Sequence, residues 1–157
     1  MARPAAGSLL GAWRLLRWEI VYDGGQRGYP FGELAAGLLI YSADGFMSAC
    51  IMTAGRPRLS AANPRAAAPA ERAAAYDGYF SYAGRYRTAG RRVFHEVEIA
   101  LNPAMTGTVQ VRSARRVGRM LELSADESLP MGACRQHRLL WQRPRPESAA
   151  QSRRRLR

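Results

Sequence analysis

Residues 37–53, GLLIYSADGFMSACIMT, carry the clearest hairpin signal of the 157-residue chain. Two apolar runs of strand length flank Asp44-Gly45, a dipeptide that favours two-residue hairpin turns because both turn residues need positive φ angles. Such a turn would place Leu39 opposite Cys50 on one face of the hairpin. Because both faces would then be apolar, we expect a second element to cover the outer face.

Alternating apolar and polar residues recur along the rest of the chain, with turn residues at short intervals, which is typical of antiparallel sheets. The expected strands are residues 11–22, 37–42, 46–53, 84–88, 92–101, 108–115, 119–124 and 136–142. A shift of apolar phase in the first strand predicts a β-bulge near Leu16 or Arg17. One short helix is expected between strands three and four, from Pro69 to about Tyr79, with Glu71 in its first turn. We therefore predict an all-β fold, an eight-stranded closed antiparallel barrel whose helix covers the hairpin's outer face.

All 24 basic residues are arginine and oppose 12 acidic residues, so the formal net charge is +12. Hydrophobic residues make up 47% of the chain, which is enough to bury a core and excludes wholesale disorder. The length predicts one barrel domain at residues 9–143, between an N-terminal extension (1–8) and a disordered arginine-rich tail (144–157). Apolar runs are shorter than the roughly 18 residues of a spanning helix, and no convincing secretory leader is seen. We expect a cytoplasmic protein without a membrane partner.

Alternation along residues 92–101 directs one set of side chains into the barrel: His95, Val97, Ile99 and Leu101. A two-residue turn at Ala89-Gly90 would place Gly84 opposite His95. Tyr82 and Tyr86 would share this inner face, and the missing side chain of Gly84 would leave space beside the imidazole.

The following strand directs Gln110 and Arg112 inward, with Val97 expected near Arg112. His95 and Arg112 would then lie about one diagonal pair apart, close enough to contact one ligand. The candidate ligand-binding residues are Arg112, Gln110, Tyr86, Tyr82 and Tyr41, and His95 is the candidate catalytic acid or base.

Two interpretations of these polar residues stay open. In a structural interpretation, Arg112 pairs with Glu33 or a backbone carbonyl group, and His95 hydrogen-bonds Tyr82 or Tyr86, because buried charges rarely stay unpaired. In a functional interpretation, Arg112 and Gln110 hold a carboxylate, enolate or carbonyl oxygen. His95, whose unperturbed pKa is about 6.5, then acts as an acid or base.

The sequence gives no support for metal, cysteine or nucleotide chemistry. His95 and His137 are far apart and lack metal-ligand spacing, so no metal is expected. Cys50 is expected to point inward, but nothing places a histidine beside it, and both Cys50 and Cys134 are expected to be buried and reduced. The sequence has no phosphate-binding glycine motif, and we expect no cofactor and no nucleotide chemistry.

A series of short motifs, in this order, resembles the lipocalin-like domain proteins of bacteria and fungi. The motifs are GAWRL (11–15), PFG (30–32), GLLIY (37–41), MSA (47–49), YAGRY (82–86), His95, LNP (101–103), QVR (110–112) and LLWQR (139–143). The resemblance covers residues 9–143 and implies an up-and-down lipocalin-like barrel. Trp13 and Arg143 resemble the lipocalin pair in which an arginine covers a tryptophan at the closed end of the barrel.

We therefore expect a barrel that binds a small hydrophobic molecule bearing a carbonyl or carboxylate group. The resemblance also implies that similar barrels act either as binders or as cofactor-independent enzymes, which leaves open an isomerisation, cyclisation or lyase step on that molecule. The alternative function is a non-catalytic module that associates with anions or nucleic acid through the arginine-rich tail.

Overall fold

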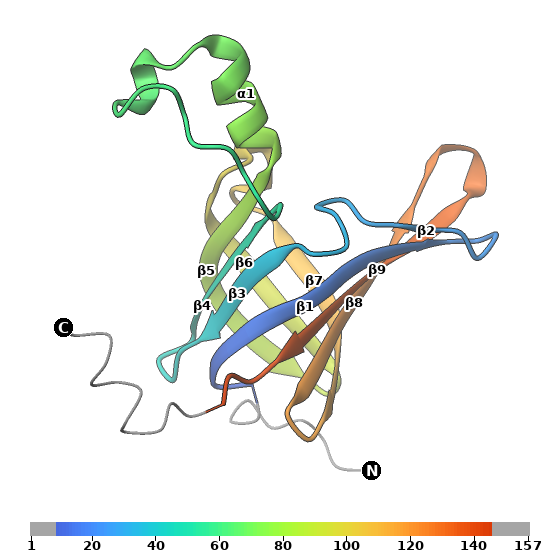
Figure 1. Ribbon diagram of the computed structural model, residues 1–157. Coiled ribbons are helices and arrows are strands. Elements are labelled where there is room, and N and C mark those ends of the chain that lie inside the picture. The colour runs from blue at the N-terminus through green and yellow to red at the C-terminus, as the bar shows by residue number, and fades with distance from the viewer. Residues whose placement is uncertain (1–8, 146–157) are drawn as a thin grey trace.

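The computed structural model describes residues 9–145 and contains a closed antiparallel β-barrel (Figure 1). The strands are β1 (Gly11–Tyr22), β2 (Arg27–Gly28), β3 (Ala36–Tyr41), β4 (Phe46–Met52), β5 (Tyr79–Ala89), β6 (Arg92–Ala100), β7 (Val109–Val117), β8 (Met120–Ser128) and β9 (Cys134–Gln142). They form one sheet in the order β2-β1-β3-β4-β5-β6-β7-β8-β9, and pairing between β1 and β9 closes it. Helix α1 (Pro69–Asp77) follows β4, and single 3-10 turns lie at Pro64–Ala66, Pro103–Met105 and Pro130–Gly132.

The predicted all-β barrel of eight strands and one helix is confirmed in outline. A ninth strand, β2, was missed, because its two residues pair only with Ile20 and Val21 of β1 and are too short to show alternation. The expected place of the helix, between the third and fourth strands, is not matched, since α1 comes after β4. The expected extension (1–8) and residues 146–157 of the expected tail lie outside the described residues. Within residues 9–145, no helix is long and apolar enough to cross a membrane.

The turn between β3 and β4 is one residue longer than expected. It occupies residues 43–45 and has Gly45 in the left-handed region, at φ 90°, as is common in three-residue hairpin loops. The extra residue shifts the register, so that Leu39 lies opposite Ala49. Cys50 therefore faces outward and is partly exposed, and the expectation that it points into the barrel is wrong. Cys134, also expected to be buried, is exposed.

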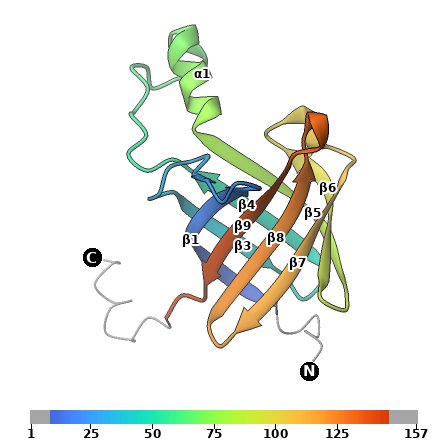
Figure 2. The same ribbon diagram turned by 90° about the vertical axis from the view of Figure 1, so that its right-hand side faces the viewer.

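Helix α1 does not cover the outer face of this hairpin. It rises from one end of the barrel (Figures 1 and 2) and contains no buried residue. Leu38 and Ile40, on the outer face, are 42% and 46% exposed. The shifted register puts Ser48 on this face beside Ile40, so the face is less apolar than the expected pairing made it.

The pairing of β5 with β6 also differs from the expected one. The turn lies one residue later than predicted, which places Tyr86 rather than Gly84 opposite His95. A register shift follows between Ala83 and Gly84. The irregularity turns Ile99 outward, where it is 70% exposed, so the predicted inward direction of Ile99 is wrong.

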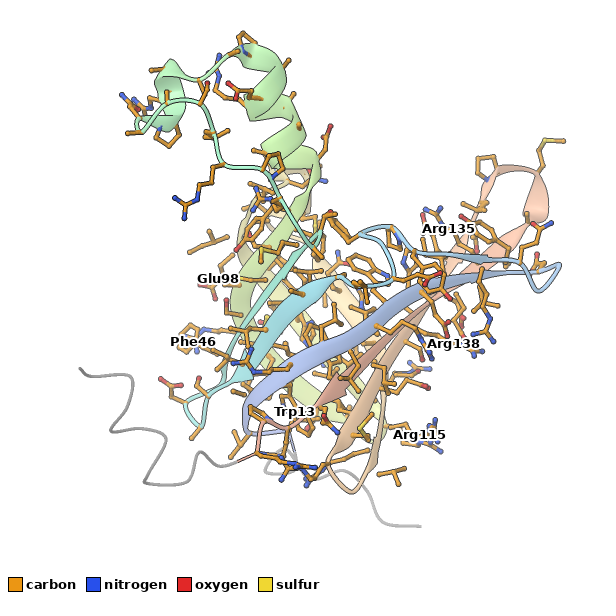
Figure 3. The ribbon with its side chains drawn as sticks, in the orientation of Figure 1. Trp13, Phe46, Glu98, Arg115, Arg135 and Arg138 are labelled. Atoms are coloured by element: carbon orange, nitrogen blue, oxygen red, sulfur yellow. The ribbon has the colours of Figure 1, made fainter. Side chains whose placement is uncertain are left out.

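Trp13 and Arg143 close the end of the barrel that holds the β3–β4, β5–β6 and β7–β8 turns, here called the base. The Trp13 side chain is fully buried and its indole N–H donates to the Leu9 carbonyl at 2.8 Å. The Arg143 guanidinium carbon lies 4.4 Å from the centre of the Trp13 ring, a cation–π distance. The expected arginine–tryptophan pair is therefore present, and Figure 3 shows Trp13 at this end. A register shift between Leu15 and Arg17 confirms the expected bulge in β1.

Gly84 is the position where a side chain is least tolerable. A Cβ atom there would lie 1.9 Å from the Glu96 carbonyl oxygen and 2.9 Å from the Glu98 nitrogen, both backbone atoms. We expect Gly84→Ala to lower the free energy of unfolding by about 2–3 kcal/mol, because two strands must separate locally. Urea unfolding measures this change. Gly24→Ala, where the added atom meets open space, is the control, and equal stabilities of the two variants would contradict the prediction.

Candidate functional site

A cavity of about 540 Å³ occupies the barrel interior. Each of the eight barrel strands contributes to its lining, as does the turn after β6. Leu39, Leu123, Leu139 and Trp141 give it an apolar surface, and all four are buried. Charged residues near the end of β8 and the start of β9 line the part of the cavity farthest from the base, here called the mouth. Figure 3 shows Arg135 at this end of the barrel.

Aromatic rings form one wall of the cavity. The rings of Trp18 and Phe80 line it and meet edge to face, with centroids 5.3 Å apart. Phe31, on the loop between β2 and β3, stacks on Trp18 with a centroid distance of 5.2 Å. Phe80 in turn contacts the Tyr82 ring at 5.6 Å. The wall therefore offers flat apolar surfaces, which suit an aromatic or other planar ligand.

His95 is fully buried and lies between two tyrosines. The Tyr41 hydroxyl is 2.7 Å from Nε2 of His95, and the Tyr82 hydroxyl is 2.8 Å from Nδ1. The structural interpretation of His95 is thus confirmed for Tyr82, whereas Tyr86 instead donates to the Ser42 carbonyl. Both nitrogens of the imidazole are occupied.

The same surroundings hold all three groups in their neutral forms. Burial, and then the nearby Arg112 charge, lower the pKa of His95 to about 3. Burial raises the pKa of Tyr41 well above its usual value, and it also raises that of Tyr82, although Arg112 acts in the opposite direction. A neutral imidazole and two neutral phenols are therefore the relevant species near pH 7.

Gln110 and Arg112 point into the cavity as expected, although their partners differ. Gln110 lies opposite His95, and Arg112 lies opposite Val93 rather than near Val97. The difference is an even number of residues, which leaves the inward direction unchanged. The Arg112 guanidinium donates to the Val111 carbonyl at 3.0 Å and to Oε1 of Gln110 at 3.3 Å.

Arg112 keeps unused hydrogen-bonding capacity. A guanidinium has five N–H donors, and its contacts with Val111 and Gln110 are to neutral acceptors. Among residues 9–145, no carboxylate lies within ion-pair distance of it, so of the two partners in the structural interpretation the backbone carbonyl is found, at Val111, and Glu33 is not. The cavity therefore contains a positive charge whose remaining donors can face a ligand.

A charged network at the mouth was not predicted from the sequence. Glu127 accepts two hydrogen bonds from Arg135, at 2.8 and 3.0 Å, and lies 2.8 Å from Nε2 of His137. The Trp18 indole N–H donates to Nδ1 of His137 at 3.2 Å. Since an indole nitrogen can only donate, Nδ1 of His137 accepts and Nε2 carries the proton. The bonds from Arg135 and then His137 lower the pKa of Glu127 to about 2.

One part of this network had a signal in the sequence, namely the opposite charges of Glu127 and Arg135 on two neighbouring segments. Glu127 and Arg135 are cross-strand neighbours on the hairpin of β8 and β9. Because the expected strands ended at residue 124 and began at 136, the pair fell in a presumed loop. Trp18 and His137 face each other only because the barrel closes, through the pairing of Ile20 with His137.

The predicted site residues fall into two groups. Tyr82, His95, Gln110 and Arg112 line the cavity. Tyr41 and Tyr86 do not line it; Tyr41 reaches it only through His95, and the two rings pack edge to face at 4.7 Å. The role of His95 as an acid or base stays a prediction, and an imidazole with both nitrogens bonded and a pKa of about 3 has no proton or lone pair ready for a ligand.

Within the described residues, no three His, Cys, Asp or Glu side chains cluster as a metal site would require.

Comparisons with known proteins agree with this architecture. A family model described as a lipocalin-like domain matches residues 10–144. Among curated proteins, the 4'-hydroxy-3'-methoxypropiophenone carrier protein ppsC of Aspergillus oryzae is 32% identical over 108 residues, which cover 64% of this chain and 97% of the relative. No solved structure gives a significant match.

The depressed pKa of His95 predicts a specific loss of stability on acidification. In the unfolded chain His95 takes up a proton near pH 6.5, whereas in the folded chain it does so only near pH 3. As pH falls through this window the unfolded state binds more protons, so the folded state loses up to about 1.4 kcal/mol per pH unit. We expect the free energy of unfolding to fall less steeply between pH 6.5 and 4 in His95→Gln than in the wild type. Parallel curves for wild type and His95→Gln would contradict the prediction.

Proposed function

The chain belongs to the lipocalin-like domain family, and from this premise we propose that it is a carrier that holds one small, mainly hydrophobic molecule inside the barrel. The observation that carries the proposal is the cavity of about 540 Å³, which combines apolar and aromatic walls with the cationic Arg112. Its volume lies within the range of about 300–1,000 Å³ that is usual for small-molecule sites. Mostly apolar linings with a few placed polar groups are also typical of such sites.

We propose a ligand with an oxygen acceptor, such as a carbonyl or carboxylate group, which the free donors of Arg112 would bind. Gln110 supports this role by accepting a hydrogen bond from the guanidinium at 3.3 Å, which limits the positions that the head group can take. Its own amide nitrogen donates to Thr108 at 3.0 Å. A ligand oxygen would supply a further acceptor for the guanidinium donors that Val111 and Gln110 leave unused.

The relative supports the same chemical class. Its name describes a carrier of a propiophenone with one hydroxy and one methoxy group, which is a single aromatic ring with oxygen substituents and a ketone. We propose that this chain takes a ligand of this class, with the ring against Trp18 and Phe80 and an oxygen toward Arg112. These two aromatic rings and the guanidinium line the same cavity.

We favour carriage over catalysis. An isomerisation, cyclisation or lyase step needs a group that moves a proton, and both nitrogens of His95 are engaged by tyrosines. Tyr82 and Tyr41 are neutral near pH 7 because burial raises their pKa values. The alternative role in binding nucleic acid depends on residues 146–157, which lie outside the described residues, and has no part in this proposal.

Calorimetric titration with 4'-hydroxy-3'-methoxypropiophenone tests the proposal. We expect saturable binding to the wild type with one site per chain. We expect the affinity of Arg112→Met to be lower by about tenfold, because a hydrogen bond from a charged group is lost. Arg87→Met is the matched control: Arg87 lies on the outer face, 3.2 Å from Glu96 and 3.9 Å from the Phe94 ring centre. Absence of saturable binding would refute carriage of this ligand class, and an unchanged affinity in Arg112→Met would refute the role of Arg112.

A further inference from the structure

Tyr41 and Tyr82 cannot both donate a hydrogen bond to His95. A neutral imidazole has one N–H and one lone pair. The tyrosine at the lone-pair nitrogen donates its hydroxyl hydrogen, and the tyrosine at the N–H accepts and keeps its own hydrogen. Among the described residues, the hydroxyls of Tyr41 and Tyr82 have no other hydrogen-bond partner. One hydroxyl hydrogen of the pair therefore has no acceptor within the protein.

Burial decides which tyrosine keeps the free hydrogen. Tyr41 is 1% exposed and does not line the cavity, so a free hydrogen there would be a buried donor without an acceptor, which is costly. Tyr82 lines the cavity, where water or a ligand can accept. The favourable arrangement has Tyr41 donating to Nε2 of His95 and Nδ1–H of His95 donating to Tyr82.

We propose that Tyr41, His95 and Tyr82 form a directed hydrogen-bond chain whose last donor, the Tyr82 hydroxyl, binds an acceptor oxygen of the ligand and selects for ligands that carry one. This inference rests on the proposed function and extends it, because it assigns selectivity to Tyr82. In this arrangement Tyr82 touches the ligand, and His95 and Tyr41 are positioning residues. Each bond polarises the next, so the hydroxyl at the end of the chain is a better donor than an isolated phenol.

Arg112 strengthens this assignment, because its side chain lines the same cavity as Tyr82 and His95. A ligand oxygen between Arg112 and Tyr82 would receive donors from β7 and from β5, the strands on either side of β6 in the sheet. A carbonyl or carboxylate oxygen that reaches both donors would pair them, whereas a purely hydrocarbon ligand would leave both without that acceptor.

The tautomer of His95 tests the chain without any ligand. Nitrogen-15 NMR of labelled imidazoles distinguishes a protonated nitrogen from an unprotonated one. We expect His95 to carry its proton on Nδ1 and His137, which accepts from Trp18 at Nδ1, to carry it on Nε2. The chain has two histidines, so one spectrum should show both forms, and the spectrum of His137→Gln assigns them. A proton on Nε2 of His95 would overturn the proposed direction of the chain.

Binding of acetophenone and ethylbenzene, which differ in one carbonyl oxygen, tests the role of Tyr82. We expect Tyr82→Phe to lower the affinity for acetophenone about three- to tenfold and to leave that for ethylbenzene unchanged, since one hydrogen bond is lost. Tyr79→Phe is the matched control on the same strand, because Tyr79 contacts Arg56 and does not line the cavity.

The outcomes separate the two proposals. If the wild type prefers acetophenone and Tyr82→Phe keeps that preference, the role of Tyr82 is refuted while the proposed carriage stands. If the wild type binds neither probe, nor the propiophenone, the carriage of such ligands is refuted. A selective loss in Tyr82→Phe, together with the Nδ1 proton on His95, supports the inference.

Discussion

Pairing between β1 and β9 is the interaction on which the rest of the structure depends. It joins Arg14–Tyr22 to Arg135–Gln142 and turns an open meander into a closed barrel. Once the sheet is closed, each side chain of a barrel strand faces either the interior or the outside. Arg112, on the inside, meets Gln110 and the cavity, whereas Arg87, on the outside, meets Glu96 and Phe94. The strand register therefore decides which of the arginines face the cavity and which face the outside.

Much of the fold could be predicted from the sequence because alternation and turn residues are local signals. The errors arose where one residue more or less in a turn decides the pairing. Asp44-Gly45 correctly indicates a hairpin, but the sequence does not distinguish a two-residue from a three-residue loop, and that difference turned Cys50 outward. Ile99 was misplaced because the irregularity near Gly84 depends on how two backbones approach each other, which alternation within one strand does not record.

For the candidate site, the direction of several side chains could be predicted from the sequence, but most contacts between distant residues could not. Gln110, Arg112 and His95 were correctly directed inward, since errors of an even number of residues preserve the facing side. The aromatic wall escaped prediction because Trp18 meets Phe80 of β5, a strand not paired with β1, and Phe31, which lies on a loop without regular structure. The contact of His95 with Tyr82 was one of the expected alternatives, because the two residues lie on strands joined by one turn. The contact with Tyr41, 54 positions away along the chain, was not expected, because it follows from the three-dimensional arrangement and not from a local motif.

The attachment of the loop that carries Phe31 has a consequence for kinetics. Strand β2 joins the barrel through two residue pairs, and beyond it Phe31 contacts the Trp18 and Phe80 rings. Local opening of such a segment disrupts far fewer interactions than separating β1 from β9. Displacement of this loop would uncover the Trp18 ring, which lines the cavity, while the barrel stays closed. Opening at this wall and stability of the barrel are therefore separable properties, which substitutions in different parts of the chain can change independently.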